Sequence, residues 1–234
     1  MAKLALVTGA AHRLGKSFAL TLARAGYDIV LHYHLAEEEA LQTKAEIESL
    51  SRNVTLAQAD LADPAQIYSL LSTIQSLDVL VNSAAFMPSG NVDALSIESW
   101  DISLDLNLRA PFLLSQECAK KMNDGGLIVN ITDVGAQKAW SKYPSYTVSK
   151  AALESLTKIL ARALAPKIRV NAIAPGFVLQ SDIVSVAEWE RLIGRIPLKR
   201  PARTEEITSA LEFLLHNQYV TGQTIVVDGG YSLL

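Results

Sequence analysis

Short apolar segments alternate with longer helix-prone segments along the whole chain. The short segments show no polar alternation, which is typical of strands covered on both faces, and they predict strands near 4–8, 28–33, 54–60, 78–82, 126–132, 168–174 and 223–230. The longer segments predict helices near 14–26, 37–50, 64–75, 99–122, 145–164 and 204–217. Strand-helix alternation implies right-handed crossovers, so we predict a doubly wound α/β domain with a seven-stranded parallel sheet flanked by helices.

The chain offers no place to divide it into two domains. We find no repeat, low-complexity tract or linker, and therefore expect residues 1–234 to form a single domain. In doubly wound sheets, ligands bind at the carboxyl ends of the strands, where the winding reverses. Every loop that follows a predicted strand is thus a candidate for site residues.

Composition narrows the classes of partner. Half of the residues are hydrophobic, 19% are charged and the net charge is -3, which suits a compact soluble protein and does not indicate nucleic-acid binding. Cys118 is the single cysteine, so no internal disulfide forms, and we expect it in the core. No segment approaches the length of a membrane span or a signal-peptide core, so we expect a cytoplasmic protein without a membrane partner.

A glycine-rich turn, "TGAAHRLG" at Thr8–Gly15, follows the first predicted strand and opens the first helix. Gly9 permits the tight turn, Gly15 permits close packing of helix on strand, and the free N–H groups of the helix start attract a pyrophosphate. An ordinary strand-helix turn is the alternative. We expect a dinucleotide site typical of Rossmann domains, with cofactor-binding residues Gly9, His12, Arg13, Leu14 and Gly15.

The end of the second strand indicates which dinucleotide binds. NAD sites place an acid there, on the ribose 2′-hydroxyl, whereas this chain has His32, Tyr33 and His34, and Glu37 is expected to open the next helix. Without that acid, Arg13 can contact a 2′-phosphate, and a contact of about 1.5–3 kcal/mol corresponds to about a 10- to 100-fold preference for NADP. We therefore expect NADPH.

The same residues also have explanations that involve no cofactor. Arg13 could be a solvated cation at a helix start, and His32 and His34 could be two strand residues on one face. Two histidines at this spacing could also be metal ligands, but a third ligand is not evident nearby, so we predict no metal.

A candidate catalytic pair lies in the fifth predicted helix. Tyr146 and Lys150 are four residues apart and share one helical face, where the ammonium is expected to lower the pKa of the phenol. Asn82 and Asn107 are expected to flank the same crevice. Alternatively, Asn107 only satisfies backbone groups.

Together these residues resemble the short-chain dehydrogenases/reductases over essentially the whole chain. The resemblance implies a cofactor turn, an adenine contact, an Asn-Asn-Ala-Gly-like element and a turn facing the nicotinamide, at Thr8–Gly15, Asp60-Leu61, Asn82-Ser83-Ala84-Ala85 and Pro175-Gly176, respectively. It also implies that Asn107, Tyr146 and Lys150 are catalytic. The family is commonly tetrameric, so a homotetramer is expected, with the apolar tail "GGYSLL" as a candidate subunit contact.

One position departs from the ordinary family pattern. Thirteen residues before Tyr146 the family usually has a serine on the substrate carbonyl, and this chain has Asp133. Thr132 is one residue short of that position and, on a strand end, would point to the opposite face. A carboxylate would repel a developing alkoxide, which disfavours simple ketone reduction and favours a substrate that needs a proton at nitrogen.

This departure is similar to one branch of the family, the pteridine reductases. The branch pairs an arginine in the glycine turn with an aspartate in the serine position, and the sequences "LHYH", "YPSY" and "VDGGYSL" are also similar to it. The resemblance implies hydride transfer from NADPH to the pterin, proton supply by Tyr146, and help with protonation and ring binding from Asp133. Lys150 would lower the pKa of Tyr146 and hold the nicotinamide ribose. Phe86 would stack on the pterin, with plain core packing as its alternative.

Other positions differ from this branch. Leu35 and Ala36 stand where relatives carry an arginine and a serine on the 2′-phosphate, which leaves Arg13 and His34 to hold it. Val178 replaces a serine, and the element at 83–86 is one residue short. Residues 177–203 are expected to form a substrate lid with Trp189 as a wall.

The sequence thus predicts an NADPH-dependent reductase of a dihydropteridine-type substrate, in the dihydrobiopterin, dihydromonapterin or dihydrofolate class. A carbonyl or 3-oxoacyl-thioester reductase of the same fold is the first alternative. A non-catalytic dinucleotide sensor is the second, which the Tyr146 and Lys150 pair disfavours.

Overall fold

A seven-stranded sheet in the order β3-β2-β1-β4-β5-β6-β7 forms the centre of the computed structural model, which describes residues 3–180 and 184–234. Every neighbouring pair of strands is parallel, as expected. The strands are β1 (Lys3–Val7), β2 (Tyr27–Tyr33), β3 (Val54–Gln58), β4 (Leu77–Asn82), β5 (Met122–Ile131), β6 (Ile168–Pro175) and β7 (Thr224–Val227). The winding reverses between β1 and β4, the point where a doubly wound sheet opens a crevice.

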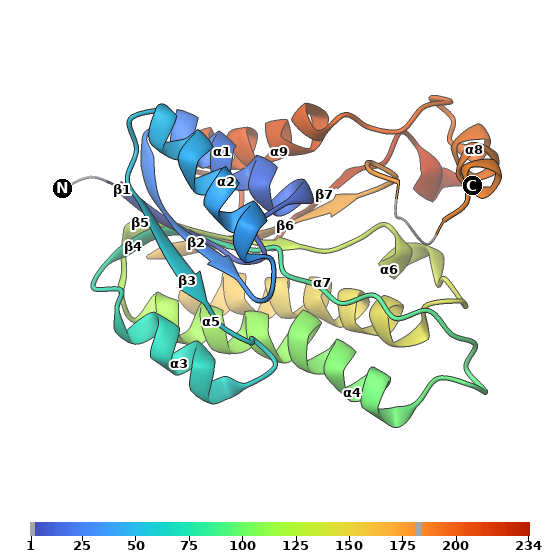
Figure 1. The fold of residues 1–234 in the computed structure, drawn as a ribbon, viewed down its shortest axis with the longest axis horizontal. Coiled ribbons are helices and arrows are strands. Elements are labelled where there is room, and N and C mark those ends of the chain that lie inside the picture. Colours follow the sequence, from blue (N-terminus) through green and yellow to red (C-terminus); the bar gives the residue numbers. More distant parts are fainter. Residues whose placement is uncertain (1–2, 181–183) are drawn as a thin grey trace.

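Helices cover both faces of the sheet. Figure 1 shows α1, α2 and α9 on one face, α3, α4, α5 and α7 on the other, and α6 and α8 beyond one end of the strands. The helices are α1 (Arg13–Arg24), α2 (Glu37–Ser49), α3 (Pro64–Ser72), α4 (Ile97–Leu104), α5 (Ala110–Ala119), α6 (Gly135–Lys138), α7 (Pro144–Leu164), α8 (Val186–Arg195) and α9 (Thr204–His216), with short turns η1 (Asp105–Arg109) and η2 (Tyr231–Leu233). Within the described ranges, no helix is long and apolar enough to cross a membrane.

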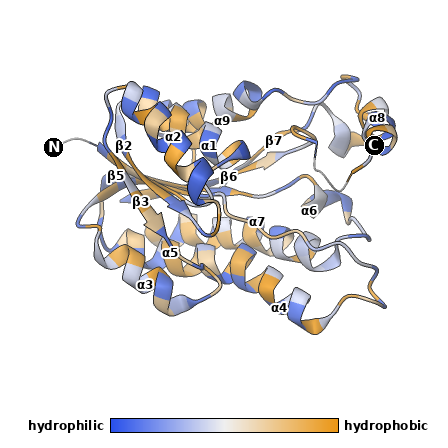
Figure 2. Cartoon of the chain, viewed as in Figure 1, coloured by the Kyte–Doolittle hydropathy of each residue, from blue (hydrophilic) through white to orange (hydrophobic). Residues whose placement is uncertain are grey.

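Successive strand residues supply two separate halves of the core. Val7 packs with Phe18 of α1 on one side of the sheet, whereas Leu6 packs with Leu80 and Leu114 on the other, and all of these side chains are buried. Figure 2 shows the hydrophobic strands enclosed between the two helix layers. Each such side chain contributes about 1.5–3 kcal/mol when fully buried. Cys118 lies in the second half of the core, as expected for a structural cysteine.

A chain of buried polar side chains joins two central strands to α7. Asn82 Nδ2 donates to Asn130 Oδ1 at 2.8 Å, across a register pair of β4 and β5. Asn130 Nδ2 in turn donates to Thr157 Oγ1 of α7 at 2.9 Å. Because an unmade hydrogen bond in the interior costs about 1–3 kcal/mol, these contacts favour one orientation of α7 against the sheet.

The segment predicted as one helix at 99–122 is interrupted. It consists of α4, a π-helical turn at Asp105–Arg109, and α5, and Met122 already belongs to β5. Pro111 lies in the first turn of α5 and has no N–H to donate, so a wider turn at this point is the less costly backbone path. The apolar spacing alone did not reveal the change.

The predicted lid at 177–203 contains a helix that the sequence reading did not anticipate. This helix, α8, begins after Ser185, whose side chain accepts from Glu188 N at 3.2 Å. Ser-x-x-Glu is an N-terminal capping signature, so the signal was present at 185–188. Residues 181–183 of the predicted lid lie outside the described residues.

Gly15 is the tightest glycine of the first turn, and we predict that Gly15→Ala lowers the free energy of unfolding by about 1–3 kcal/mol. A Cβ on Gly15 would lie 2.0 Å from the backbone oxygen of Gly9, so the turn would have to deform. Gly194→Ala is the matched control, because a Cβ there has open space and a helical alanine gains up to about 1 kcal/mol. Urea denaturation measures both, and equal effects would contradict the prediction.

Candidate active site

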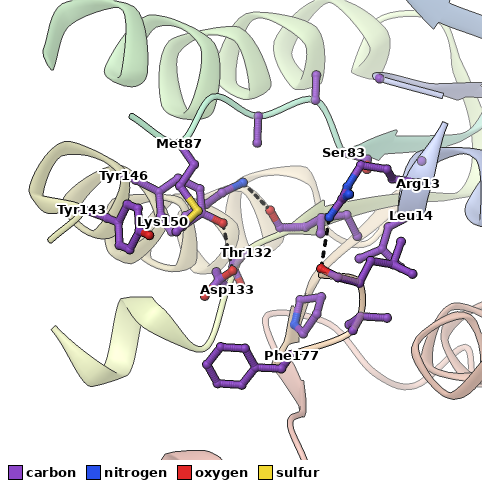
Figure 3. Close-up of a pocket in the computed structure, with 18 of the residues that line it drawn as sticks. Arg13, Leu14, Ser83, Met87, Thr132, Asp133, Tyr143, Tyr146, Lys150 and Phe177 are labelled. Carbon is purple, nitrogen blue, oxygen red and sulfur yellow. Dashed lines mark hydrogen bonds between the residues drawn. The ribbon is translucent and has the colours of Figure 1, made fainter. Parts of the chain in front are cut away.

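A cavity of about 970 Å³ lies at the carboxyl ends of the strands, at the reversal of the winding. Its walls come from the loops after β1, β2, β3, β4, β5 and β6, together with α8 and the C-terminal turn. Figure 3 shows side chains from the loops after β1, β4, β5 and β6, among them Arg13, Ser83, Asp133 and Phe177, around the cavity. A volume of this size accommodates an extended cofactor together with a substrate.

His32, the second residue of the sequence "LHYH", holds the glycine turn in place by a hydrogen bond. The Gly9 N–H donates to His32 Nδ1 at 3.0 Å, and His32 Nε2 lies 3.1 Å from the Ala59 oxygen. These partners assign the neutral tautomer with hydrogen on Nε2, in keeping with burial, which lowers the pKa of His32 to about 4. Both ring nitrogens are therefore occupied, and His32 is a structural support of the turn instead of a metal ligand.

The start of α1 fits a pyrophosphate. Its N-cap residue, His12, forms no side-chain capping bond and its first turn carries no acid, whereas Ser96 and Ser185 cap α4 and α8. The N–H groups at the start of α1 and its positive dipole end thus face the cavity without a side-chain cap. Gly9 has φ +62°, and a Cβ on it would lie 2.9 Å from Ala84 Cα, so only glycine fits there.

Arg13 occupies an unusual position in this turn. Its φ is +52°, a left-handed conformation that costs a residue with a side chain about 1–3 kcal/mol. Its guanidinium donates to the backbone oxygens of Leu179 at 3.2 Å and Gln180 at 3.4 Å, at the start of the predicted lid (Figure 3). Arg13 is thus directed across the cavity, and His34 lines the same cavity.

The other predicted cofactor contacts divide into those at the cavity and those behind it. The cavity wall contains His12, Leu14, Tyr33, Asp60, Leu61, Ser83, Ala84, Pro175 and Gly176. Thr8 Oγ1 accepts from Ser83 N at 2.9 Å and from Ala84 N at 3.0 Å, which binds the loop after β4 to the glycine turn. Asn82 is buried in the core, and the described wall of the cavity does not include it.

Three titratable side chains meet on the substrate side of the cavity (Figure 3). Tyr146 Oη donates to Asp133 Oδ2 at 2.9 Å, and Asp133 Oδ1 accepts from Gly135 N at 2.6 Å. Lys150 lies one turn after Tyr146 on α7, with Nζ donating to the Ile131 oxygen at 2.8 Å. The predicted common face of Tyr146 and Lys150 is confirmed, and Asp133 joins them.

The expected effect of Lys150 on Tyr146 is wrong for this arrangement. The pKa of Tyr146 is raised well above its usual value of 10.0, by burial and then by the charge and hydrogen bond of Asp133. Burial lowers the pKa of Lys150 to about 8 and raises the pKa of Asp133 to about 6. The Lys150 ammonium lies 5.6 Å from the Tyr146 ring centroid and binds a backbone oxygen, so the nearer carboxylate dominates at the phenol.

Thr132 does not take the place of the missing serine. Its hydroxyl donates to the Ile173 oxygen of β6 at 3.2 Å, whereas Asp133 binds Tyr146. The two neighbours therefore face different partners at the strand end, as the alternation of side chains predicts.

Asn107 acts on the backbone of the loop after β4. Its Oδ1 accepts from Phe86 N at 2.8 Å and its Nδ2 donates to Phe86 O at 2.8 Å and to Ser149 Oγ at 3.0 Å. Asn107 is fully buried in the π-helical turn, and the described wall of the cavity does not include it. The alternative that it satisfies backbone groups is thus observed, and a direct catalytic role stays a prediction.

Only some of the residues predicted to contact the substrate line the cavity. Trp189 lines the cavity as expected. The Phe86 side chain is 38% exposed and is not part of the described cavity wall, where its neighbour Met87 lies instead.

Sequence reasoning missed most of an aromatic group at the substrate end. Phe177 lies 5.0 Å from Tyr231, 5.9 Å from Trp140 and 5.9 Å from Trp189 between ring centroids. Tyr143 contacts Trp140 at 6.3 Å. These residues come from the loops after β5, β6 and β7 and from α8, so no local spacing reveals the group. For Trp140, Tyr143 and Tyr231 the available signal was their position after a strand, whereas Phe177 and Trp189 lie in the predicted lid.

The chain is similar to known proteins over nearly its whole length. The family model described as enoyl-(acyl carrier protein) reductase matches residues 9–232. A curated relative, the 3-oxoacyl-[acyl-carrier-protein] reductase FabG of Staphylococcus aureus, is 35% identical over 241 aligned positions, which cover 98% of this chain and 98% of that protein.

Solved structures agree in fold. FolM alternative dihydrofolate reductase 1 from Brucella canis, complexed with NADP, is 34% identical with a TM-score of 0.92, covering 99% of this chain and 94% of that one. A short chain dehydrogenase from Burkholderia cenocepacia, in complex with NADP, is 30% identical with a TM-score of 0.91, covering 98% and 97%. By its fold, its cavity and these relatives, the chain belongs to the short-chain dehydrogenase/reductase family.

Proposed function

We propose that this protein is an NADPH-dependent reductase of dihydropteridine-type substrates. The observation that carries the proposal is the carboxyl group of Asp133, hydrogen-bonded to the Tyr146 hydroxyl at 2.9 Å, in the position where the family usually has a serine. The FolM relative, an alternative dihydrofolate reductase by its description, supports the same substrate class.

Several features support NADPH as the cofactor. The solved relatives contain NADP, and the end of β2 carries no acid that would repel a 2′-phosphate. The glycine turn and the uncapped start of α1 would hold the pyrophosphate, Arg13 and His34 the 2′-phosphate, and Tyr146 and Lys150 the nicotinamide ribose. When bound, the nicotinamide supplies the hydride.

Asp133 is suited to protonate a ring nitrogen. With a pKa of about 6 it is partly protonated near neutral pH, and its two oxygens are held by the Gly135 N–H and the Tyr146 hydroxyl. The raised pKa of Tyr146 keeps the phenol protonated, so it remains a hydrogen-bond donor, whereas Asp133, with its lower pKa, is the better proton source. Above pH 6 the ionised carboxylate of Asp133 dominates, and a ketone oxygen in the same place would develop negative charge beside it, which is unfavourable.

The aromatic group suits a planar heterocycle. Phe177, Trp140, Trp189 and Tyr231 form one contiguous set of rings beside Gly135, where a Cβ would lie 2.7 Å from Trp140 Cε3. Flat rings offer stacking surface to a pterin. The acyl chain of a thioester has no aromatic ring that could stack on this surface.

A 3-oxoacyl-thioester reductase is the second candidate, and the similarity to FabG favours it. The two candidates differ in what they require at position 133. A thioester's keto oxygen needs a neutral donor there, whereas a pteridine nitrogen needs an acid.

We also propose a homotetramer in the cytoplasm. Large hydrophobic side chains are exposed on α4, α5 and α7, all on one face of the sheet: Ile102, Phe112, Val148 and Ile159. Large exposed apolar side chains on one helix layer favour association between subunits. Light scattering measures the assembly.

Asp133→Ser tests the choice between pteridine and ketone. We expect kcat/KM for 7,8-dihydrobiopterin to fall about 10²- to 10⁴-fold, because an acid is lost, and activity on acetoacetyl-CoA to rise. Asp124→Ser, at the opposite end of β5, is the control and should change neither rate. An unchanged substrate profile in Asp133→Ser would argue for the thioester reductase.

The pH profile tests the state of Asp133. Its pKa is raised from 3.8 to about 6, so the protonated acid dominates below pH 6 and is lost above it. We expect kcat/KM for dihydrobiopterin to fall as pH rises through about 6, and Asp133→Asn to abolish that limb. Stopped-flow oxidation of NADPH measures it, and a rate that climbs between pH 6 and 8 would contradict the assignment.

Arg13→Gly tests cofactor selection. Glycine tolerates the φ of +52°, so the backbone should keep its shape while the cation is lost. We expect the KM for NADPH to rise about 10- to 100-fold and that for NADH to change little. Lys16→Gln, a cation on α1 paired with Glu46, is the control. An equal rise in the KM values for NADPH and NADH would contradict the prediction and indicate that Arg13 acts through its contacts with the lid.

A further inference from the structure

The mouth of the cavity is lined by positive charge that the proposed chemistry does not use. Arg191 and Arg195 lie four residues apart on α8 and both line the cavity, with Leu192 between them. Lys142, which precedes α7, lines it as well. Of the described residues of α8 none is fully buried, so this helix presents its side chains to the cavity mouth and to solvent.

These cations are only partly neutralised by their neighbours. Glu188 Oε1 lies 3.8 Å from both Lys142 Nζ and Arg191 Nη2, so one carboxylate is shared by two cations at a loose distance. The side chains of Lys142 and Arg191 are 73% and 63% exposed. Lys138, at the same end, already donates to the Leu234 oxygen. Lys142, Arg191 and Arg195 outnumber Glu188, which pairs with two of them, so the mouth is positive on a chain whose net charge is -3.

Contacts within the cavity lead from the reacting end to this mouth. Asp133 binds Gly135, which packs on Trp140. Trp140 contacts Phe177, and Phe177 contacts Trp189 of α8, the helix that carries both arginines. A ring held at Asp133 and stacked on these aromatic side chains would therefore direct a side chain toward Arg191 and Arg195.

We infer that this mouth is a subsite for carboxylates, so that the preferred substrates are dihydropteridines with an anionic tail, and not those with a neutral hydroxyalkyl chain. The inference rests on the proposed function. Arginine matches carboxylates by its paired donors. Each exposed ion pair is worth up to about 1 kcal/mol, so the two arginines together correspond to up to about a 30-fold effect on substrate binding.

A graded set of substrates tests the inference on the full-length protein with NADPH. Dihydrobiopterin carries no carboxylate, dihydropteroate one and dihydrofolate two. We expect KM to fall along this series in wild type. The double variant Arg191→Ala/Arg195→Ala should raise the KM for dihydrofolate about 3- to 30-fold and leave that for dihydrobiopterin within about 2-fold.

Controls separate charge from folding. Arg191→Lys/Arg195→Lys should retain most of the preference, and Lys167→Ala, an exposed cation just before β6 at the opposite edge of the sheet, should have no effect. Added salt should raise the KM for dihydrofolate most, that for dihydropteroate less and that for dihydrobiopterin little, because the Debye length falls from about 8 Å at 0.15 M to about 3 Å at 1 M.

The outcomes distinguish the subsite from the proposed function. Reduction of all three substrates with one common KM, or an equal rise for all three in the double variant, would overturn the subsite and leave the dihydropteridine reductase intact. Failure to reduce any of them would overturn the proposed function, and the subsite with it.

Discussion

Parallel pairing of β1 with β2 on one side and β4 on the other is the constraint on which the site depends. Parallel strands deliver all their carboxyl ends to one edge, and the reversal between β1 and β4 separates the loops there. The glycine turn, Ser83, Asp133 and Phe177 meet at this edge although they span most of the chain. Without the shared edge, none of them would be neighbours.

The site carries costs that the core does not. Raising the pKa of Asp133 from 3.8 to about 6 amounts to about 3 kcal/mol of disfavoured ionisation, since each pKa unit is about 1.4 kcal/mol. Because the folded protein binds this proton more tightly than the unfolded chain, protonation of Asp133 stabilises the fold at low pH. That stabilisation is lost as pH rises through about 6. Arg13 adds a left-handed backbone. Costs of this kind concentrate where a residue is needed for something other than stability.

Two buried polar side chains act through the backbone of others. His32 holds Gly9 through a neutral ring, and Asn107 holds both backbone groups of Phe86. A buried polar group left unpaired is costly, so each of these contacts restricts its loop to one conformation. The glycine turn and the loop after β4 are therefore positioned by buried side chains that belong to other elements, β2 and the π-helical turn.

The sequence by itself determined the doubly wound sheet, the glycine turn and the Tyr146 and Lys150 pair, because each depends on local spacing and on which residues follow a strand. The exceptional position of Asp133 followed from the resemblance to the family, whose members usually have a serine there. It did not show the π-helical turn at Asn107, nor that Met87 and not Phe86 reaches the cavity. Only the tertiary structure decided the direction of the Tyr146 pKa and the grouping of Trp140, Phe177 and Tyr231. The physical reason is that burial and charge at a side chain are set by residues distant in the chain, whereas backbone preference and periodicity are set by near neighbours.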